Sequence, residues 1–506
     1  MTEELAEPYL RGVLATAGLD VEYVRGDGDT LYYRKGDDEV PVLDFVGGYG
    51  STMLGHSNPE IISYARELLA GQTPIHAQFS RHPYANEVAA KLNTIIKRET
   101  GSDESYFAIF ANSGAEAIEA AMKHAEFERY VRLEGLRAEI GANIEAVRAA
   151  VTDGTVAAAE ANALIADVTA HNEALAGRTP LFLTPVGSFH GKLAGSTQLT
   201  YNPVYRVVFS ALAAQARFVP VDEPGALDAV VESERRWLHD VAIDGGQVKV
   251  VQRPFPGFCA VVLEPILGEG GIHEMPATFV RDIQRVAAEL EIPVVVDEIQ
   301  SGMGRTGAFL ASTHLGLRGD YYALAKSLGG GIAKAAVMLV RASRYQSNFE
   351  MMHSSTFAKD SFSCLIAAKV LDTLEAGDGE IYRTAESRGA ELRNVLQDLM
   401  KEFPEVIKDV RGRGLMIGLE FLEQGEARSA ILRELHGSGF FGYYLSGFLL
   451  REHSIRTFPT SSAVYTLRFE PSANISTADI AKLAEGLRDL CGQIRDTDGQ
   501  RLAPVA

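Results

Sequence analysis

Lys326 and Asp297 are the residues whose types and positions point most strongly to chemistry. Each follows a short apolar run: Asp297 comes directly after Val294–Val296, and Lys326 lies between Tyr321–Ala325 and the glycines 329–331. A lysine amine can form a Schiff base with an aldehyde, and an acid can pair with a protonated pyridine nitrogen. Together they are what an enzyme needs to hold pyridoxal phosphate (PLP) and to make its ring an electron sink.

Both residues have a competing interpretation. Asp297 could be a turn or helix-capping residue, and its neighbour Glu298 could be the functional acid instead. Lys326 taken alone would be a surface lysine. The strand pattern favours Asp297, and the apolar run before Lys326 favours a buried amine whose pKa is lowered, which suits Schiff-base chemistry.

The elements that position these residues are predicted to be strands of one sheet. Between about residues 86 and 340, helical segments alternate with short apolar runs, at 106–111, 181–184, 259–263, 292–296 and 321–325. Near-continuous apolar strands separated by helices indicate a parallel sheet buried on both faces. Ligands of such sheets bind beyond the carboxyl ends of the strands. We therefore expect one site, formed by the residues that follow these runs: Asn112, Ser113, Glu264, Asp297 and Lys326.

The segment that follows the apolar run 106–111 predicts a phosphate site. This segment begins a helix, and its Ser113 and Glu116 have the spacing of a capping box. The free N–H groups and the positive dipole end of a helix N-terminus bind anions, and Gly114 would let a phosphate approach the backbone. A capped helix without a ligand is the alternative, and the downstream lysine and acid favour the phosphate site.

Composition argues against several classes of protein. The chain has 506 residues, 46% of them hydrophobic, and a net charge of −19, so it can form more than one core and is a poor partner for nucleic acid or an anionic membrane. Three widely spaced cysteines, Cys259, Cys364 and Cys491, suggest neither a disulfide framework nor a metal cluster, and they fit a reducing cytoplasm. The acidic start lacks the layout of a signal peptide, and no apolar stretch is long enough to span a bilayer.

The pattern divides the chain into two domains. Residues 86–364 are the expected PLP-binding large domain, and 365–506 are a smaller domain that the N-terminal segment 1–85 joins. Residues 126–179 are predicted to be an inserted helical hairpin. It could widen a dimer contact, shape a pocket for a large substrate, or be surface decoration. The predicted fold class is α/β, with a mostly parallel sheet in the large domain and a smaller α+β domain from both chain ends.

Six motifs resemble the class III aminotransferases, a branch of the fold type I PLP enzymes that includes ornithine, 4-aminobutyrate and ω-amino acid aminotransferases. They occur in family order: Ser-Gly-Ala-Glu-Ala from 113, Phe-His-Gly from 189, Glu-Pro-Ile-Leu-Gly-Glu-Gly-Gly from 264, Asp-Glu-Ile-Gln-Ser-Gly-Met-Gly-Arg-Thr-Gly from 297, Lys-Ser-Leu-Gly-Gly-Gly from 326 and Ser-Thr-Phe from 355. The resemblance runs from about residue 30 to about 490. It implies the type I fold and an aminotransferase activity.

The resemblance also implies roles for single residues. Lys326 would be the Schiff-base lysine and Asp297 the partner of the pyridine nitrogen. The other expected cofactor contacts are Ser113, Gly114 and Ala115 at the phosphate, Phe189 stacked on the ring beside His190, Glu264, Ile299 under the ring, Gln300 at the ring hydroxyl, and Thr356. For Phe189, a core aromatic at a strand end is a fair alternative. Thr356 would contact the cofactor phosphate of the neighbouring subunit, which implies a homodimer with shared active sites. No metal is expected.

Arg468 and Glu269 are the expected substrate-binding residues. In family members that use glutamate, an arginine near the C-terminus binds the substrate carboxylate, and a glutamate pairs with it when an amine is bound instead. Arg468, in Thr-Leu-Arg-Phe-Glu-Pro, and Glu269 fit these roles, because a buried guanidinium needs a carboxylate partner between the half-reactions. An ordinary structural ion pair is the alternative. Two departures from the family pattern concern the substrate side: Leu267 where Gln is frequent, and Glu470-Pro471-Ser472 where Pro-Pro is frequent.

The sequence therefore predicts a PLP-dependent aminotransferase that moves an amino group from a donor amino acid, L-glutamate, to an aldehyde or ketone, with a guessed role in secondary-metabolite biosynthesis. Two alternatives stay open: an epimerase, aminomutase or decarboxylase on the same fold, and a non-catalytic binding protein that has kept it. The expected partners are a small-molecule amino donor and a carbonyl acceptor, with neither nucleic acid nor membrane, and the expected location is the cytoplasm.

Overall fold

A seven-stranded sheet forms the centre of the protein, whose computed structural model describes residues 8–77, 80–212, 215–496 and 499–503. The strand order is β4-β14-β13-β12-β9-β5-β6. The strands span Tyr106–Ala111 (β4), Leu181–Pro185 (β5), Gln215–Val219 (β6), Phe258–Leu263 (β9), Val294–Asp297 (β12), Tyr321–Leu324 (β13) and Ala336–Arg341 (β14). Only β14 runs against its neighbours; the others are parallel. This confirms the predicted mostly parallel sheet.

Both faces of the sheet are buried, which explains why its strands are apolar at every position. Val295 of β12 packs in a cluster with α5 (Gly114–Thr152), whereas its neighbours Val294 and Val296 pack in another cluster with α9 (Ala277–Leu290). Helices α4 (Pro83–Thr100) and α10 (Ser361–Glu402) contribute to the cluster that contains Val294 and Val296. The two helix layers therefore cover the faces of the sheet, and the parallel strands end together at one edge.

The helix starts follow the expected local rules. Pro59 begins α3 (Pro59–Ala70), and the side chain of the preceding Asn58 accepts hydrogen bonds from the N–H groups of Glu60 and Ile61 at 3.1 and 3.2 Å. This satisfies two of the four N–H groups that a helix start leaves without a partner. The remaining short elements of this half are α2 (Gly47–Gly50), α7 (Pro203–Arg206), α8 (Ala226–Glu234), β10 (Ile266–Leu267) and β11 (His273–Glu274).

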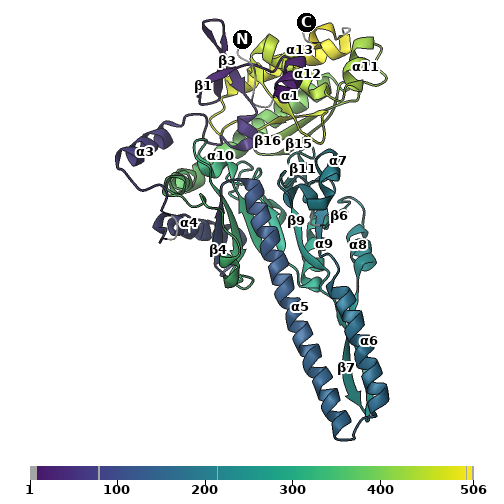
Figure 1. Ribbon diagram of the computed structural model, residues 1–506. Helices are drawn as coiled ribbons and strands as arrows, with labels where there is room; N and C mark the ends of the chain where they lie inside the picture. The colour runs from purple at the N-terminus through teal and green to yellow at the C-terminus, as the bar shows by residue number, and fades with distance from the viewer. Residues whose placement is uncertain (1–7, 78–79, 213–214, 497–498, 504–506) are drawn as a thin grey trace.

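A long arm projects from the body (Figure 1). It consists of the far part of α5, helix α6 (Ala158–Ala176) and the antiparallel hairpin of β7 (Trp237–Asp244) and β8 (Gln247–Pro254). Two small apolar clusters hold it together, and β7 contributes Leu238 to one and Val241 to the other. The predicted hairpin began near residue 126, but the phosphate-loop helix and the first hairpin helix are one continuous helix. The β-hairpin that completes the arm was not predicted.

The second region combines both chain ends. Strands β1 (Tyr23–Asp27), β2 (Thr30–Lys35) and β3 (Asp38–Asp44) pair with β17 (Ile455–Arg456), which lies parallel to β3. A second sheet has the order β15-β16-β19-β18, spanning Ile407–Arg413, Met416–Phe421, Thr466–Phe469 and Phe458–Pro459. Helices of this region are α1 (Pro8–Thr16), α11 (Ala430–Gly437), α12 (Phe441–His453) and α13 (Thr477–Asp496).

The domain bounds stay a prediction. Helix α10 crosses the predicted boundary at 364/365, and its backbone leaves the helical conformation only at Ala376–Gly379. The outermost residues of the predicted segments, 1–7 and 504–506, lie outside the described residues. None of the helices in the described ranges has both the length and the apolar character needed to cross a bilayer.

Candidate functional site

A cavity of about 460 Å³ opens at the carboxyl edge of the sheet. Most of the predicted site residues line it: Ser113, Gly114, Ala115, Phe189, His190, Glu264, Glu269, Asp297, Ile299, Gln300 and Lys326. They come from segments that follow β4, β5, β9, β12 and β13. No lining residue belongs to 126–179, so the suggestion that this insertion shapes the pocket is wrong for this cavity.

Lys326 begins a short 3₁₀ turn directly after β13. Its φ is +49°, a left-handed conformation that a non-glycine residue adopts only where the surroundings enforce it. The next residue contributes to this, because the Ser327 hydroxyl donates to the carbonyl of Gly50 at 2.8 Å. Burial lowers the pKa of Lys326, and its amine forms no ion pair within the described residues. Lys326 therefore lines the cavity with an amine that loses its proton more readily than that of an exposed lysine.

Asp297 is held at the cavity floor by two donors. Its Oδ2 lies 2.8 Å from Nδ1 of His190, and its Oδ1 accepts from the N–H of Ile299 at 3.1 Å. The other ring nitrogen of His190 lies 3.3 Å from the hydroxyl of Thr184. Asp297 is 4% exposed and His190 is 2% exposed. The imidazole thus fixes the orientation of the carboxylate, and both residues line the cavity.

Glu298 points into the protein instead of the cavity. It is fully buried, and its carboxylate accepts hydrogen bonds from the Ser301 hydroxyl at 2.8 Å and from the N–H groups of Ala311 and Ser312 at 3.1 and 2.7 Å. Burial raises its pKa to about 7, although these donors oppose the shift. Of the two adjacent acids, only Asp297 faces the cavity.

The start of α5 forms one wall. The Ser113 hydroxyl accepts from the N–H of Glu116 at 3.3 Å, but the Glu116 carboxylate reaches past the cap to the N–H of Asn112 at 2.7 Å. The capping box is thus shifted by one residue from the predicted form. A Cβ at Gly114 would lie 2.8 Å from Cδ1 of Ile299. Glycine is needed here because a cavity-lining side chain packs directly on the helix start.

Glu264 fixes the loop that carries Phe189. Its two carboxylate oxygens accept from the N–H groups of Phe189 at 2.8 Å and Gly268 at 3.0 Å. Burial raises the pKa of Glu264 to about 7, and the nearby Asp297 adds to the rise while His190 opposes it. The Phe189 ring lines the cavity and meets Tyr205 edge-on at 6.2 Å.

Arg468 and Glu269 form a two-pronged ion pair, of which Glu269 lines the cavity and Arg468 lies behind it, outside the lining. Nη1 and Nη2 of Arg468 lie 2.5 and 2.6 Å from the two oxygens of Glu269, and the Ser461 N–H donates to the same carboxylate at 2.8 Å. Arg468 is 1% exposed. Burial by itself would raise the pKa of Glu269, but the guanidinium outweighs it and holds that pKa at about 2. Tyr49 covers the guanidinium, with its ring centre 4.9 Å from Cζ.

Gln300 lines the cavity, but its amide nitrogen donates to a protein group. Nε2 lies 2.9 and 3.0 Å from the two carboxylate oxygens of Glu470, which is fully buried. The sequence marked Glu470 only as part of Glu470-Pro471-Ser472, a stretch where Pro-Pro is frequent in the family. Thr184, Ser51 and Lys334 were also missed, and nothing in their sequence context marks them.

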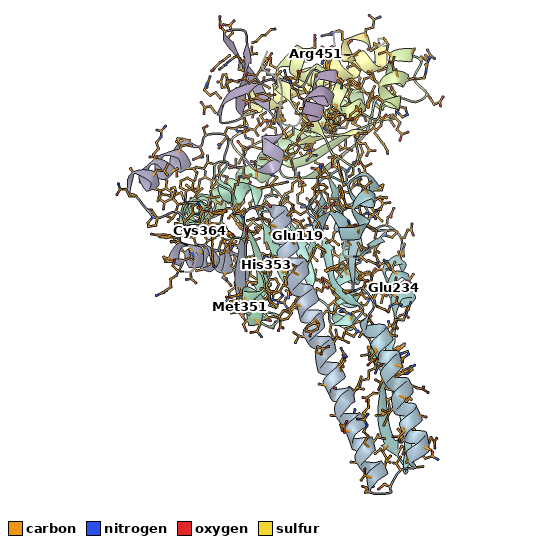
Figure 2. The ribbon with its side chains drawn as sticks, in the orientation of Figure 1. Glu119, Glu234, Met351, His353, Cys364 and Arg451 are labelled. Atoms are coloured by element: carbon orange, nitrogen blue, oxygen red, sulfur yellow. The ribbon has the colours of Figure 1, made fainter. Side chains whose placement is uncertain are left out.

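Thr356 does not line the cavity of its own chain. It lies on an exposed segment after residues 347–351, where the preceding Ser355 hydroxyl accepts from the Asn112 side chain at 2.7 Å. Figure 2 shows His353 of this segment near Glu119 of α5, and Nδ1 of His353 lies 3.2 Å from Nζ of Lys123 on the same helix. The segment therefore contacts the phosphate-loop helix through His353.

The residues present fit PLP. The free N–H groups of the α5 start suit a phosphate, Asp297 suits a protonated ring nitrogen, and the Lys326 amine suits an aldehyde. Ile299 and Phe189 supply apolar walls for a flat ring between these ends. When bound, PLP supplies an electron-withdrawing ring that stabilises negative charge on the substrate carbon. Within the described residues, no group of three or more His, Cys, Asp or Glu side chains is placed to hold a metal ion.

Comparison with known proteins gives the same result. Residues 15–460 match the family described as Aminotransferase class-III. The fold is similar to that of ornithine aminotransferase from Toxoplasma gondii (TM-score 0.69, 19% identity, 99% of this chain and 100% of that one). It is also similar to a PLP-bound amine transaminase from an uncultivated Pseudomonas species (0.70, 20%, 97% and 98%) and to an omega transaminase from Pseudomonas jessenii in complex with PMP (0.70, 20%, 98% and 97%).

The fold is therefore that of the type I PLP enzymes, as the sequence predicted. The match covers most of the chain, and the cavity contains the lysine, the acid and the helix start that the cofactor needs. The chain belongs to the class III aminotransferases and is a PLP-dependent aminotransferase.

Proposed function

We propose that this aminotransferase takes its amino group from L-glutamate and passes it to an aldehyde or ketone. The observation that carries the proposal is the buried ion pair of Arg468 with Glu269, the member of the pair that lines the cavity. A bidentate guanidinium is well suited to a carboxylate. Glutamate would place its α-carboxylate on Arg468 and displace Glu269. A substrate without a carboxylate there would leave the pair closed.

Lys326 and Asp297 are the catalytic residues of this proposal. The neutral amine of Lys326, favoured by burial, would take the proton from the substrate carbon and deliver it to C4′ of the cofactor. Asp297, oriented by His190, would pair with the ring nitrogen of the cofactor. Ser113, Gly114 and Ala115 bind the phosphate, while Phe189, Ile299, Gln300 and Glu264 shape the ring site.

A single-turnover experiment tests the donor. The PLP-loaded protein is mixed with one amino donor and no acceptor, and both the visible spectrum and the products are followed. With L-glutamate we expect loss of the visible band and about one equivalent of 2-oxoglutarate per active site. Racemised, isomerised or decarboxylated amino acid would favour the epimerase, aminomutase or decarboxylase alternative. No lysine-dependent band at all would favour a binding protein.

We also propose a homodimer with shared sites. Thr356 lies among exposed apolar side chains: Met351 is 91%, Met352 53% and Phe357 60% exposed. Such a patch on one segment is typical of a surface that a partner covers. Met351→Lys should lower the dimer fraction in sedimentation velocity, and Thr356→Ala should weaken PLP retention without changing the mass. A monomeric wild-type protein with full activity would contradict this.

The proposal also concerns the chemical class of the carbonyl acceptor. Leu267 and the stretch Glu470-Pro471-Ser472, where the family pattern differs, favour a non-standard carbonyl compound, such as an aldehyde or ketone of secondary metabolism, converted in the cytoplasm. A panel of aldehydes and ketones offered to the amino-loaded enzyme tests it. Preference for ornithine, acetylornithine or 4-aminobutyrate as the partner substrate would contradict it.

A further inference from the structure

Lys334 lines the cavity, and the proposed function assigns it no role. Its side chain is exposed, and it comes two residues before β14. Among the described residues that line the cavity, Lys326 and Lys334 are the two that are lysine or arginine. The ammonium of Lys334 forms no ion pair with a carboxylate in the described part of the chain. It is therefore a positive charge at the cavity that the protein itself does not neutralise.

The sheet topology places Lys334 beside the phosphate loop. Strand β14 lies between β4 and β13 and runs against both, so it begins at the edge where those two strands end. The register pairs Ala336, the first residue of β14, with Ala111, the last residue of β4. Ser113 comes two residues after this pair and Lys334 two residues before it, and both line the cavity. The two segments therefore leave neighbouring strands at the same edge.

The same strand order separates Lys334 from the expected substrate side. Along this edge from β4, the sheet presents Ser113 after β4, Lys334 before β14, Lys326 after β13 and Asp297 at the end of β12. Glu269, the partner of Arg468, follows β9, which is the next strand in this order. Lys334 thus lies between the phosphate loop and the Schiff-base lysine, at the other end of this row from the proposed carboxylate site.

A phosphate at the start of α5 needs more positive charge than the helix supplies. A phosphate monoester carries roughly −1.5 to −2 charges at neutral pH, whereas a helix start offers N–H groups and roughly half a positive charge. The phosphate loop Ser113-Gly114-Ala115 contains no basic side chain. Lysine commonly binds phosphate as a point charge. Of the two lysines that line the cavity, Lys326 is committed to the aldehyde, which leaves Lys334.

We propose that Lys334 is a further cofactor-binding residue, whose ammonium pairs with the phosphate of PLP at the start of α5. The proposal rests on the proposed phosphate role of Ser113, Gly114 and Ala115, and it does not depend on which amino acid is the donor. Because Lys334 is exposed, salt should screen the pairing. The affinity for PLP should therefore fall with rising salt more steeply in wild type than in a variant without this charge.

A comparison of PLP with pyridoxal, which lacks the phosphate, tests the pairing. The dissociation constants of both aldehydes are measured from the visible band, starting from cofactor-free wild type, Lys334→Met and Lys334→Arg. Lys334→Met should weaken PLP binding by about tenfold, as the loss of one charge-assisted hydrogen bond does, and should leave pyridoxal binding unchanged. Lys334→Arg keeps the charge and should retain most of the affinity for PLP. Lys482→Met, which removes an exposed lysine of α13 outside the cavity lining, is the matched control and should change neither constant.

Equal losses for the two aldehydes would overturn the proposal, because Lys334 would then shape the pocket without contacting the phosphate. Unchanged binding of both would overturn it as well, and a raised KM for L-glutamate in that case would assign Lys334 to the substrate.

A measurement on wild type covers the case in which Lys334→Met does not fold. At equal occupancy of Lys326, PLP should protect Lys334 from acetylation more strongly than pyridoxal does, as read by mass spectrometry. Equal protection by the two aldehydes would contradict the pairing. The binding and acetylation readouts use no amino donor, so they remain decisive if L-glutamate fails as a substrate.

Discussion

Replacing Glu269 by Gln is the sharpest test of the buried ion pair. The change keeps the side-chain size but removes the charge that faces Arg468, whose guanidinium is 1% exposed. The free energy follows from the pKa of Glu269, which is about 2 in the folded protein against an ordinary 4.5. A difference of this size corresponds to roughly 3 kcal/mol at neutral pH. It agrees with the roughly 3–5 kcal/mol that removing one partner of a buried pair costs.

The sign of the pH dependence follows from the same shift. The folded protein holds the Glu269 pKa below its unfolded value, so the stabilisation is fully present above about pH 4.5 and is lost as the pH falls toward 2. Denaturant unfolding of wild type and Glu269→Gln should therefore differ by about 3 kcal/mol at pH 7. The difference should shrink below pH 4.5. Glu145→Gln, which breaks an exposed pair with Arg148, is the control and should change little.

Kinetics complete the test. In Glu269→Gln the guanidinium of Arg468 is free, so the half-reaction with L-glutamate should keep its rate, while the half-reaction with a substrate that lacks a carboxylate should slow. The quantity to compare is the ratio of kcat/KM for L-glutamate to kcat/KM for the substrate that lacks a carboxylate. Equal losses in both half-reactions, or a stability difference that does not change between pH 4.5 and 2, would refute the reasoning and leave an ordinary structural ion pair.

Five further substitutions, one of them a control, test the rest of the site. Lys326→Ala should abolish turnover and the visible band while leaving the unfolding midpoint nearly unchanged. Asp297→Asn should leave the protein folded but reduce kcat by orders of magnitude. Glu298→Ala should keep PLP binding but lower the free energy of unfolding by about 3 kcal/mol, since it leaves buried hydrogen-bond donors unpaired. The reverse pattern would mean that the roles of the two acids had been exchanged. Gly114→Val should destabilise the helix start by about 1–3 kcal/mol and weaken PLP binding; Gly135→Ala, on the same helix with open space around it, should be neutral or stabilising.

The strand ends were predictable because parallel strands buried on both faces carry an unambiguous apolar signal. Asp297 and Lys326 each end such a run, and both line the cavity. The choice between Asp297 and Glu298 was only weakly indicated, because both acids directly follow the apolar run 294–296. The structure separates them by their partners: His190 for one, backbone N–H groups for the other.

Contacts between distant segments were not predictable. The bond between Gln300 and Glu470 joins two segments that no local pattern connects, and the pairing of Glu269 with Arg468 was left open for the same reason. The β7–β8 hairpin carries too many charged and exposed side chains to produce a strand signal, since its folding depends on the two helices that cover it. Its existence follows from tertiary packing.

Helix α5 has a mechanical consequence. Its 39 residues run from the phosphate loop to the arm tip, a rod of about 58 Å at 1.5 Å per residue. A tilt of about 5° around the cavity end would move the far end by about 5 Å, although atoms at the pivot would shift far less. The arm therefore amplifies small rotations of the start of α5, which lines the cofactor site. A spectroscopic label at the turn 153–155 would magnify ligand-induced rotations that are too small to detect at the cavity itself.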